Sequence, residues 1–434
     1  MKASILVLAL FCSFLLAALA LDISLLWALA AGYGLFFVHA LKEGVPARRL
    51  VSVSLSGMRT VSPILAVFVI IGMLTASWRA SGTIACLVSM SLGVMEPEFF
   101  LPCSFLLNCA LSWLLGSSFA TAATLGVITM SLGNALHVPA VLCAGSILAG
   151  IYFGDRGSPM STSALLVATV TKTRVYDNVR LMMRTSWPAF AASIVLYAAL
   201  SLLLRPEGSI PNVQGLFAAE FSLTPLLALP ALLLLALAFM RVRVHLAMLA
   251  STVLALAFCL FLQDTQPSAL PSLLIHGFAA QDPNVARILN GGGVLSMAEV
   301  AGIVCISSTY AGIFREGGLL RVLTPLVHLI AKRWNDYAPS LVVGFLTACI
   351  SCNQTLPIML TQQITASLTL PPSRQAIDLE DSAVLVPALI PWSRACAIPL
   401  QMLEAPDASV ALAFYLWLLP LSRLFITPRA RCSK

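Results

Sequence analysis

The chain has 434 residues, of which 59% are hydrophobic and only 10% are charged, whereas a soluble domain carries about 25% charged residues. Its mean hydropathy of +0.95 also excludes an ordinary soluble domain. The net charge of +7 does not indicate a nucleic-acid partner, because the basic residues cluster in short segments between apolar runs, as in membrane proteins. The apolar runs are long and unbroken, which predicts an all-α polytopic membrane protein.

The first 60 residues predict a helical hairpin followed by a basic loop. Residues 1–21 combine one lysine with an apolar run, which fits either a signal peptide or a first membrane helix. A second apolar span follows at once over 22–41, so the hairpin is the preferred interpretation. The basic segment 42–49 is expected on the cytoplasmic side of the membrane.

Three further segments divide the rest of the chain. Residues 61–205 and 295–434 predict two transporter repeats, the second with a cytoplasmic tail, and 206–294 predict connecting helices with an exterior loop. The apolar segments are expected at 61–78, 82–95, 98–115, 138–153, the run up to 204, 222–240, 244–262, 295–313, 319–331, 338–352, 354–369, 383–400 and 408–426. Loops are expected inside at 172–184 and 241–243, and outside at 205–220 and 264–293. We therefore expect about 10–13 transmembrane or re-entrant helices, with both termini on the cytoplasmic side of a bacterial inner membrane.

The two predicted repeats resemble each other in the order of their polar interruptions. The small-residue stretch 116–127 corresponds to 345–355, and 154–159 corresponds to 379–387. Paired, interrupted helices in two halves of a chain indicate the binding site of a transporter with inverted-topology repeats. We therefore expect two inverted-topology halves.

Asp155 is the first candidate site residue, within the segment IYFGDRGSP. The glycines and proline there can interrupt a helix, which leaves backbone carbonyls and helix ends free to bind a cation. Ser158, Ser161 and Thr162 supply further oxygens, the ligands that hard ions such as Na+ prefer. The alternative is a loop at the membrane surface in which Asp155 pairs with Arg156.

Glu380 and Asp381 are the second pair of candidates, because an acid within a membrane segment marks a functional site by default. They precede the apolar run 383–400, and acids are also favourable at a helix N-terminus for purely structural reasons. The correspondence with Asp155 favours a functional role. Asp155 and Asp381 are therefore the candidate Na+ ligands.

Small and polar residues fill the stretch 116–127, which includes Thr121 and Thr124. The stretch could form a binding hairpin or a close helix–helix contact, and the two roles are compatible. Arg79 and Arg394 lie near the ends of apolar runs, where arginine commonly extends to the membrane interface. Arg394 could instead pair with an acid or bind a substrate carboxylate through two hydrogen bonds.

Five motifs of the chain resemble the NhaC-type sodium/proton antiporter family of the ion-transporter superfamily, over about residues 25–425. They are IGMLTASWRASGT, GSSFATAATLGV, YFGDRGSPMS, GGGVLSM and LEDSAVLVPALIPW, at 71–83, 116–127, 152–161, 291–297 and 379–392. The resemblance implies a secondary antiporter whose two inverted-topology halves contribute helical hairpins to a site at the middle of the membrane. One hairpin of the site is implied to hold Asp155, Ser158 and Ser161. The other is implied to hold Asp381 and Glu380, with Trp392 and Ser393 beyond, and Thr121 and Thr124 match a threonine-rich stretch of the family.

Three positions depart from the family pattern. Thr162 stands where the family usually has an acid, and Asn353 replaces the aspartate of a Gly-Asp-Gln triplet. Arg394 occupies a position that is usually polar and uncharged. The expected site is therefore less negative than that of the family, which extends the candidate substrates from Na+ to organic anions.

We predict a secondary active antiporter that exchanges protons for a monovalent cation, with Na+ as the first candidate. A partly desolvated carboxyl group can hold a proton or a cation but not both, and we expect Asp155 and Asp381 to act in this way. Neutral ligands are expected from Ser158, Thr162, Thr121 and Asn353. The alternative is a Na+- or H+-coupled transporter of a small carboxylate or amino acid held by Arg394 or Arg156. A structural or sensory membrane subunit with a degenerate site is a third class.

The sequence gives little support to other functional classes. No nucleotide-binding loop, haem motif or catalytic-triad spacing appears, so we do not expect an enzyme. Cys349 and Cys352 form a CxxC without a second pair, so we expect no cofactor besides the transported Na+ and H+. The expected partners are membrane lipid and a small ion or small-molecule substrate, and the chain could form a homodimer.

Overall fold

The computed structural model describes residues 23–59, 61–92, 97–203, 213–240, 242–316, 324–351 and 353–427, together with 6, 7, 10, 11, 13–15, 17, 18 and 21. These residues are almost entirely helical. They form no β-strand and only one isolated bridge, between Phe278 and Gly291. The predicted all-α fold is therefore confirmed.

The first part of the chain contains the helices that precede the connecting segment. They are α2 (Leu25–Lys42), α3 (Ala47–Arg59), α4 (Ser62–Ala80), α5 (Thr83–Leu92), η1 (Pro97–Phe99), α6 (Phe100–Leu115), α7 (Ser118–Thr121), η2 (Ala122–Gly126), α8 (Val127–Ala135), α9 (Ala140–Gly157), α10 (Thr162–Thr171) and α11 (Val175–Leu203). The π-helix η2 joins α7 to α8 without a break. The three elements therefore form one continuous helix that begins at Ser118.

The connecting segment and the second part follow. Their helices are α12 (Val213–Glu220), η3 (Pro225–Ala228), α13 (Leu229–Phe239), α14 (Val244–Phe261), η4 (Pro267–Ala269), α15 (Leu270–His276), α16 (Pro283–Leu289), η5 (Val294–Met297), α17 (Ala298–Glu316), α18 (Thr324–Arg333), α19 (Ala338–Ser351), α20 (Thr355–Thr365), η7 (Ala366–Leu368), α21 (Pro372–Glu380), η8 (Val386–Leu389), α22 (Arg394–Met402), η9 (Asp407–Leu412) and α23 (Phe414–Ile426). The predicted exterior loops therefore contain short helices, α12, α15 and α16.

Three predicted boundaries are wrong. The expected loop 172–184 is mostly helix, because α11 begins at Val175 and carries its charged first turns outside the apolar run. The expected basic loop 42–49 is shorter, since α3 already begins at Ala47. The apolar run 383–400 is not one helix, because it is interrupted between η8 and α22, where Pro391 lacks a backbone N–H donor.

Few helices are long and apolar enough to span a membrane alone. Among the described residues these are α2 and α11, and α4 with α5 makes a third candidate that is bent by 63°. Seven other apolar segments have only 10–17 residues, and at 1.5 Å per residue such helices are shorter than the hydrocarbon core of a bilayer. Interrupted helices therefore account for much of the apolar sequence.

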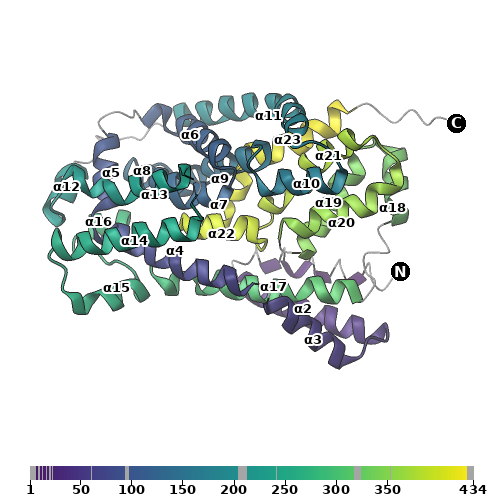
Figure 1. Cartoon of the computed structure of the whole chain (residues 1–434), viewed down its shortest axis with the longest axis horizontal. Helices are drawn as coiled ribbons and strands as arrows, with labels where there is room; N and C mark the ends of the chain where they lie inside the picture. The colour runs from purple at the N-terminus through teal and green to yellow at the C-terminus, as the bar shows by residue number, and fades with distance from the viewer. Residues whose placement is uncertain are drawn as a thin grey trace.

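Figure 1 shows how these helices are arranged around the interrupted ones. The helices α2, α3 and α17 lie along the lower edge of the view and α11 along the upper edge, while α7, α9, α10 and α22 occupy the centre. α17 packs against both α2 and α3, and α6 packs against α9 along much of its length. The chain thus surrounds its interrupted helices with continuous ones.

The contact between α6 and α9 depends on glycine. A Cβ atom on Gly154 would lie 2.0 Å from the backbone carbonyl carbon of Ser112 and 2.1 Å from the backbone nitrogen of Trp113. Small residues allow two helix backbones to approach this closely. Because Gly154 directly precedes Asp155, the close approach of α6 and α9 also fixes the position of the Asp155 backbone.

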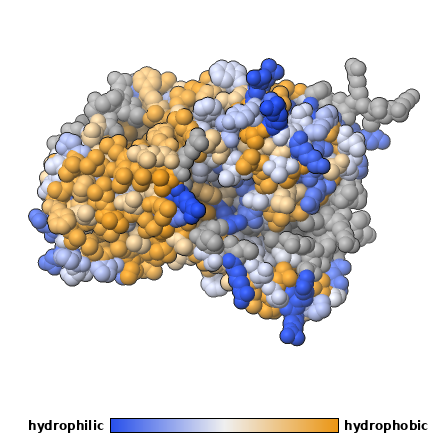
Figure 2. All heavy atoms as spheres, in the orientation of Figure 1, coloured by the Kyte–Doolittle hydropathy of each residue, from blue (hydrophilic) through white to orange (hydrophobic). Residues whose placement is uncertain are grey.

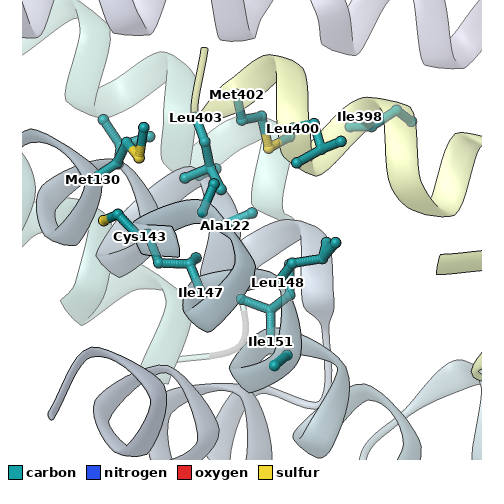
Figure 3. Close-up of a cluster of buried hydrophobic side chains, with 14 of the residues drawn as sticks. Ala122, Met130, Cys143, Ile147, Leu148, Ile151, Ile398, Leu400, Met402 and Leu403 are labelled. Carbon is teal, nitrogen blue, oxygen red and sulfur yellow. The ribbon is translucent and has the colours of Figure 1, made fainter. Parts of the chain in front are cut away.

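The surface in Figure 2 has a broad hydrophobic face over the part where Figure 1 places α13 and α14. The large exposed side chains of α13 and α14 include Leu232, Phe239 and Val253. In the interior, Ile398 and Leu400 of α22 pack with Ile147 and Leu148 of α9 in one hydrophobic cluster (Figure 3). An apolar exterior around an apolar interior is the pattern of a protein whose solvent is lipid.

Candidate functional site

Four helices begin around one cavity of about 380 Å³, which we call the central cavity. Its wall contains residues at the first turn or cap of α7, α10, α20 and α22, namely Ser117, Phe119, Thr162, Asn353, Gln354, Thr355, Arg394 and Ala395. Val67 and Phe68 of α4 and His245 and Met248 of α14 close the wall. Figure 2 shows the surface hollowed near the centre of the view, in the region of α7 and α22. The cavity therefore lies where the interrupted helices meet.

Helix starts carry unpaired backbone N–H groups and a partial positive charge. Three of these starts are capped by serine: Ser117 accepts a hydrogen bond from Ala120 N, Ser161 from Ser163 N and Ala164 N, and Ser393 from Ala395 N. The serine-rich sequence thus produces the helix interruptions. The capping serines satisfy some of the N–H groups at these starts, and each start keeps a partial positive charge.

Asp155 is buried directly behind the cavity wall, with 5% of its surface exposed. Its Oδ1 accepts a hydrogen bond from the backbone N–H of Ser118 at 3.3 Å, at the start of α7. Its Oδ2 accepts one from Nε2 of Gln354 at 3.0 Å. Gln354 itself lines the cavity and also donates to the Val384 carbonyl at 2.8 Å. A single side chain therefore separates the Asp155 carboxylate from the cavity.

The alternative in which Asp155 pairs with Arg156 in a surface loop is wrong. Arg156 is fully buried, and its guanidinium group pairs with the Asp381 carboxylate. It also donates to Thr185 Oγ1 at 2.8 Å and to the Glu380 carbonyl at 3.2 Å. The two neighbouring residues therefore face different partners, Asp155 toward the cavity and Arg156 toward α11 and the end of α21.

Asp381 lies between two arginines. One carboxylate oxygen is bonded by Arg156, and the other lies 2.6 Å from Nε of Arg423. Arg423 also bonds Asp378 at 2.7 Å. Because both oxygens face guanidinium groups, the geometry argues against Asp381 as a cation ligand in this conformation. The reading of Glu380 and Asp381 as the start of a helix is also wrong, since they stand at the C-terminal end of α21.

Glu380 differs from every other acid near the site. Its side chain is fully buried, and within the described part of the chain neither carboxyl oxygen has a hydrogen-bond partner. An ionised carboxylate in such a place is costly unless it is paired or protonated. Glu380 is therefore the acid near the site for which a bound proton would relieve the greatest burial cost.

The other predicted site residues fall into two groups. Thr162, Asn353 and Arg394 line the central cavity. Thr121, Thr124, Ser158 and Ser161 are buried, and their hydroxyl groups bond to backbone groups nearby in the chain. The structure thus brings the three residues that depart from the family pattern into one cavity. Ser158 and Ser161 cap the helices at the interruption between α9 and α10, whereas Thr121 and Thr124 bond to carbonyl groups one turn earlier in the helix that begins at Ser118.

Two contributors, Gln354 and His245, were not predicted, and Ser118 was predicted only as part of the stretch 116–127. Gln354 joins Asp155 to the cavity, and Ser118 supplies the other hydrogen bond to Asp155. His245 reaches the cavity from α14. Gln354 follows Asn353 directly in the motif that departs from the family, which is the signal that could have identified it. His245 had no such signal, because only packing brings α14 to this place.

Comparison with known proteins identifies relatives over most of the chain. The profile of the Na+/H+ antiporter family matches residues 1–169 and 150–426. The Na(+)/H(+) antiporter NhaC of Alkalihalophilus pseudofirmus is 26% identical over 82% of this chain and 79% of its own length. The Na(+)/H(+) antiporter NhaC of Bacillus subtilis is 27% identical over 89% of this chain and 88% of its own length.

A relative that is named for a different activity is similar to this chain to a comparable degree. The arginine/ornithine antiporter ArcD of Halobacterium salinarum is 28% identical over 78% of this chain and 73% of its own length. Its name specifies amino-acid exchange, whereas the two NhaC proteins are named for Na+ and H+. The relatives therefore share antiport and differ in what they carry.

Proposed function

Because the chain belongs to the Na+/H+ antiporter family, we propose that it is a secondary active antiporter that exchanges protons for Na+ across a bacterial inner membrane. The basic segments between its apolar runs support a cytoplasmic location for both termini. The observation that carries the proposal is the central cavity, where four helices begin and where Gln354 connects the wall to the buried Asp155. The chain is an integral membrane protein, and here a buried carboxylate lies one side chain away from a cavity.

Exchange follows from competition at Asp155. A carboxyl group that has bound a proton carries no charge and no longer attracts a cation, and a carboxylate that holds a cation excludes the proton. Thr162 and Ser117 lie in the cavity wall, and their side chains carry neutral oxygens. Gln354 holds the carboxylate at the wall without neutralising it, because an amide carries no net charge.

Glu380 is the second proton carrier in this scheme. It is buried without a hydrogen-bond partner in the described part of the chain, and Asp381 beside it is already paired with Arg156. Glu380 is therefore the acid that we assign to receive a proton released by Asp155. Asp155 would then select the cation, while Glu380 would store a proton.

Inverted-topology halves remain part of the proposal. Helices are interrupted between α6 and α7 and between α9 and α10 in the first part, and between α19 and α20 and between α21 and α22 in the second. Equal numbers of interruptions in matching order support two repeats that meet at the cavity.

Flux measurements with purified protein test the proposal. Proteoliposomes with an imposed pH gradient and a trapped pH-sensitive dye receive Na+, Li+, K+ or an organic anion, one at a time. The expected result is that Na+ dissipates the gradient and that the response depends on the protein. Absence of any cation response, with intact and inserted protein, would overturn Na+/H+ exchange.

A second candidate is coupled transport of a small carboxylate or amino acid. Arg394 lines the central cavity beside the starts of α10 and α20, and guanidinium groups and helix N-termini both favour anions. The volume of about 380 Å³ lies in the range of small-molecule sites. Exchange of an amino acid or carboxylate in the same proteoliposomes, lost in Arg394→Ala, would establish this candidate over the first.

A further inference from the structure

A second, smaller cavity lies at the other end of α22, which we call the distal cavity. It has a volume of about 190 Å³ and is lined mainly by polar groups, including Ser131, Asn134, Arg79 and Glu404. It lies beside the segment that ends at Asn290, which also contributes to its wall. The central cavity instead includes His245, the second residue of α14, two positions after the basic segment 241–243. The two cavities therefore lie toward opposite ends of α4, because Val67 and Phe68 line the central cavity and Arg79 lines the distal one.

One buried side chain borders both cavities. Met402, the last residue of α22, lines the central cavity and the distal cavity, and only 2% of its surface is exposed. Figure 3 shows Met402 and Leu403 at the end of α22, with Leu403 pointing toward Ala122, and Met130 nearby. Met130 and Leu403 also line the distal cavity. These apolar side chains therefore form a barrier between the central cavity and the distal cavity, each of which also has polar groups in its wall.

An ion pair closes the distal side of this barrier. Nη2 of Arg79, at the end of α4, lies 2.8 Å from Oε2 of Glu404, which follows α22. Arg79 Nη1 donates to the Asn290 carbonyl at 2.7 Å, and Glu404 Oε1 accepts from the backbone N–H of Gly292 at 2.8 Å. The ion pair thus joins α4, the glycine segment 291–293 and the end of α22.

The glycine segment is shaped for this contact. Gly291, Gly292 and Gly293 have φ angles of 126°, 76° and 86°, which L-residues rarely adopt. A Cβ on Gly291 would lie 2.2 Å from Arg79 Nη1 and 2.5 Å from Glu404 Oε2. Glycine therefore allows the backbone to approach both charged groups, and the motif GGGVLSM acquires a role that the ion site itself does not explain.

We propose that Arg79, Glu404 and Met402 form a gate that closes the central cavity toward the side of the membrane on which the segment 264–293 lies. The gate rests on the proposed transport function. α22 begins at the central cavity with Arg394 and ends at the gate, so a movement of this helix changes both. Opening breaks the pair between Arg79 and Glu404 and withdraws Met402 from between the two cavities.

Thiol accessibility tests the gate without relying on transport. Thr355→Cys, in the wall of the central cavity, is the reporter, and labelling by a membrane-impermeant maleimide is measured from each side in right-side-out and inverted vesicles. Labelling of the parent chain without the reporter is subtracted, because the chain has eleven cysteines of its own. In the parent with the reporter, labelling is expected from the side opposite the segment 264–293.

Neutralising the ion pair should expose the reporter to the second side. Arg79→Gln and Glu404→Gln are each expected to increase labelling from the side of the segment 264–293 about tenfold. Each variant removes the ion pair that stabilises the closed gate, so the equilibrium shifts toward the open gate. The glutamine in Glu404→Gln can still accept the hydrogen bond from Gly292. This variant should therefore fold even if Arg79→Gln does not. Arg374→Gln, which removes an arginine from the pair with Asp378, is the matched control and should leave labelling unchanged.

The outcomes separate the gate from the proposed function. Unchanged labelling in both gate variants, with folded protein, overturns the gate even if Na+ exchange is observed. Increased labelling without Na+-dependent flux in the parent supports the gate and leaves Na+/H+ exchange refuted. An equal increase in Arg374→Gln would also overturn the gate, because the effect would then reflect a general loss of packing.

Discussion

Replacing Asp155 by asparagine should abolish exchange while leaving the protein folded. The side chain is buried and accepts one hydrogen bond from Ser118 N and one from Gln354 Nε2. Asparagine retains the shape but only one acceptor oxygen, so one of the two donors loses its partner. The expected cost to stability is that of one unsatisfied buried donor, about 1–3 kcal/mol.

The expected effect on transport is larger. Removing one partner of a buried pair of charges costs about 3–5 kcal/mol, which corresponds to roughly 100-fold to 4000-fold weaker cation binding because about 1.4 kcal/mol is a factor of ten. Asparagine also has no ionisable proton, so the competition that couples the two ions is lost. Both effects act on the same step, and we expect no detectable Na+-dependent dissipation of a pH gradient.

Everted vesicles with a pH-sensitive dye provide the assay, and thermal unfolding in detergent measures stability. Asp177→Asn, at an exposed position in the first turn of α11, is the matched control and should retain normal exchange. Near-normal exchange by Asp155→Asn would refute the assignment of the site. Loss of exchange together with loss of inserted protein would instead show that the carboxylate is structural.

Three other predictions concern the cavity wall, the buried ion pair and the helix contact. Asn353→Asp and Thr162→Asp each place a carboxylate in the central cavity. Either variant should lower the Na+ concentration for half-maximal exchange about tenfold, because about 1.4 kcal/mol of added attraction is enough for that change. An increase in this concentration would contradict a cation site. Arg156→Met leaves a buried carboxylate without one of its arginines, and it should lower the free energy of unfolding by about 3–5 kcal/mol, measured in detergent, whereas an unchanged melting temperature would refute the pairing. Gly154→Ala should strongly destabilise the protein, because the added Cβ atom would collide with the backbone of α6. Gly34→Ala should not, because a Cβ atom there has no neighbour within 4 Å. Equal melting temperatures for the two variants would contradict the close approach of α6 and α9.

The sequence determines much of the architecture because its signals are local. Apolar runs long enough to require lipid, with basic segments between them, predict a helical membrane protein without any knowledge of packing. Serine, glycine and proline at 116–118 and 157–161 predict helix interruptions, and the structure has both. The sequence identifies Asp155 for the same reason. A charged residue within an apolar run stands out whatever the run packs against.

Packing between distant segments decided the roles of the remaining charges. Asp155 and Arg156 are adjacent in the sequence, yet one faces the central cavity and the other pairs with Asp381, 225 positions along the chain. Asp381 and Glu380 look equivalent in the sequence, but only Asp381 meets arginines from α9 and α23.

A candidate ion site therefore depends on more than which residues are acidic. Whether a buried acid is neutralised, protonated or left to bind a cation depends on which donors and charges lie within a few ångströms of it. Residues hundreds of positions away supply those groups. The sequence alone could thus name the acids, and only the tertiary structure could separate the acid that meets a cavity from the one that holds the fold together.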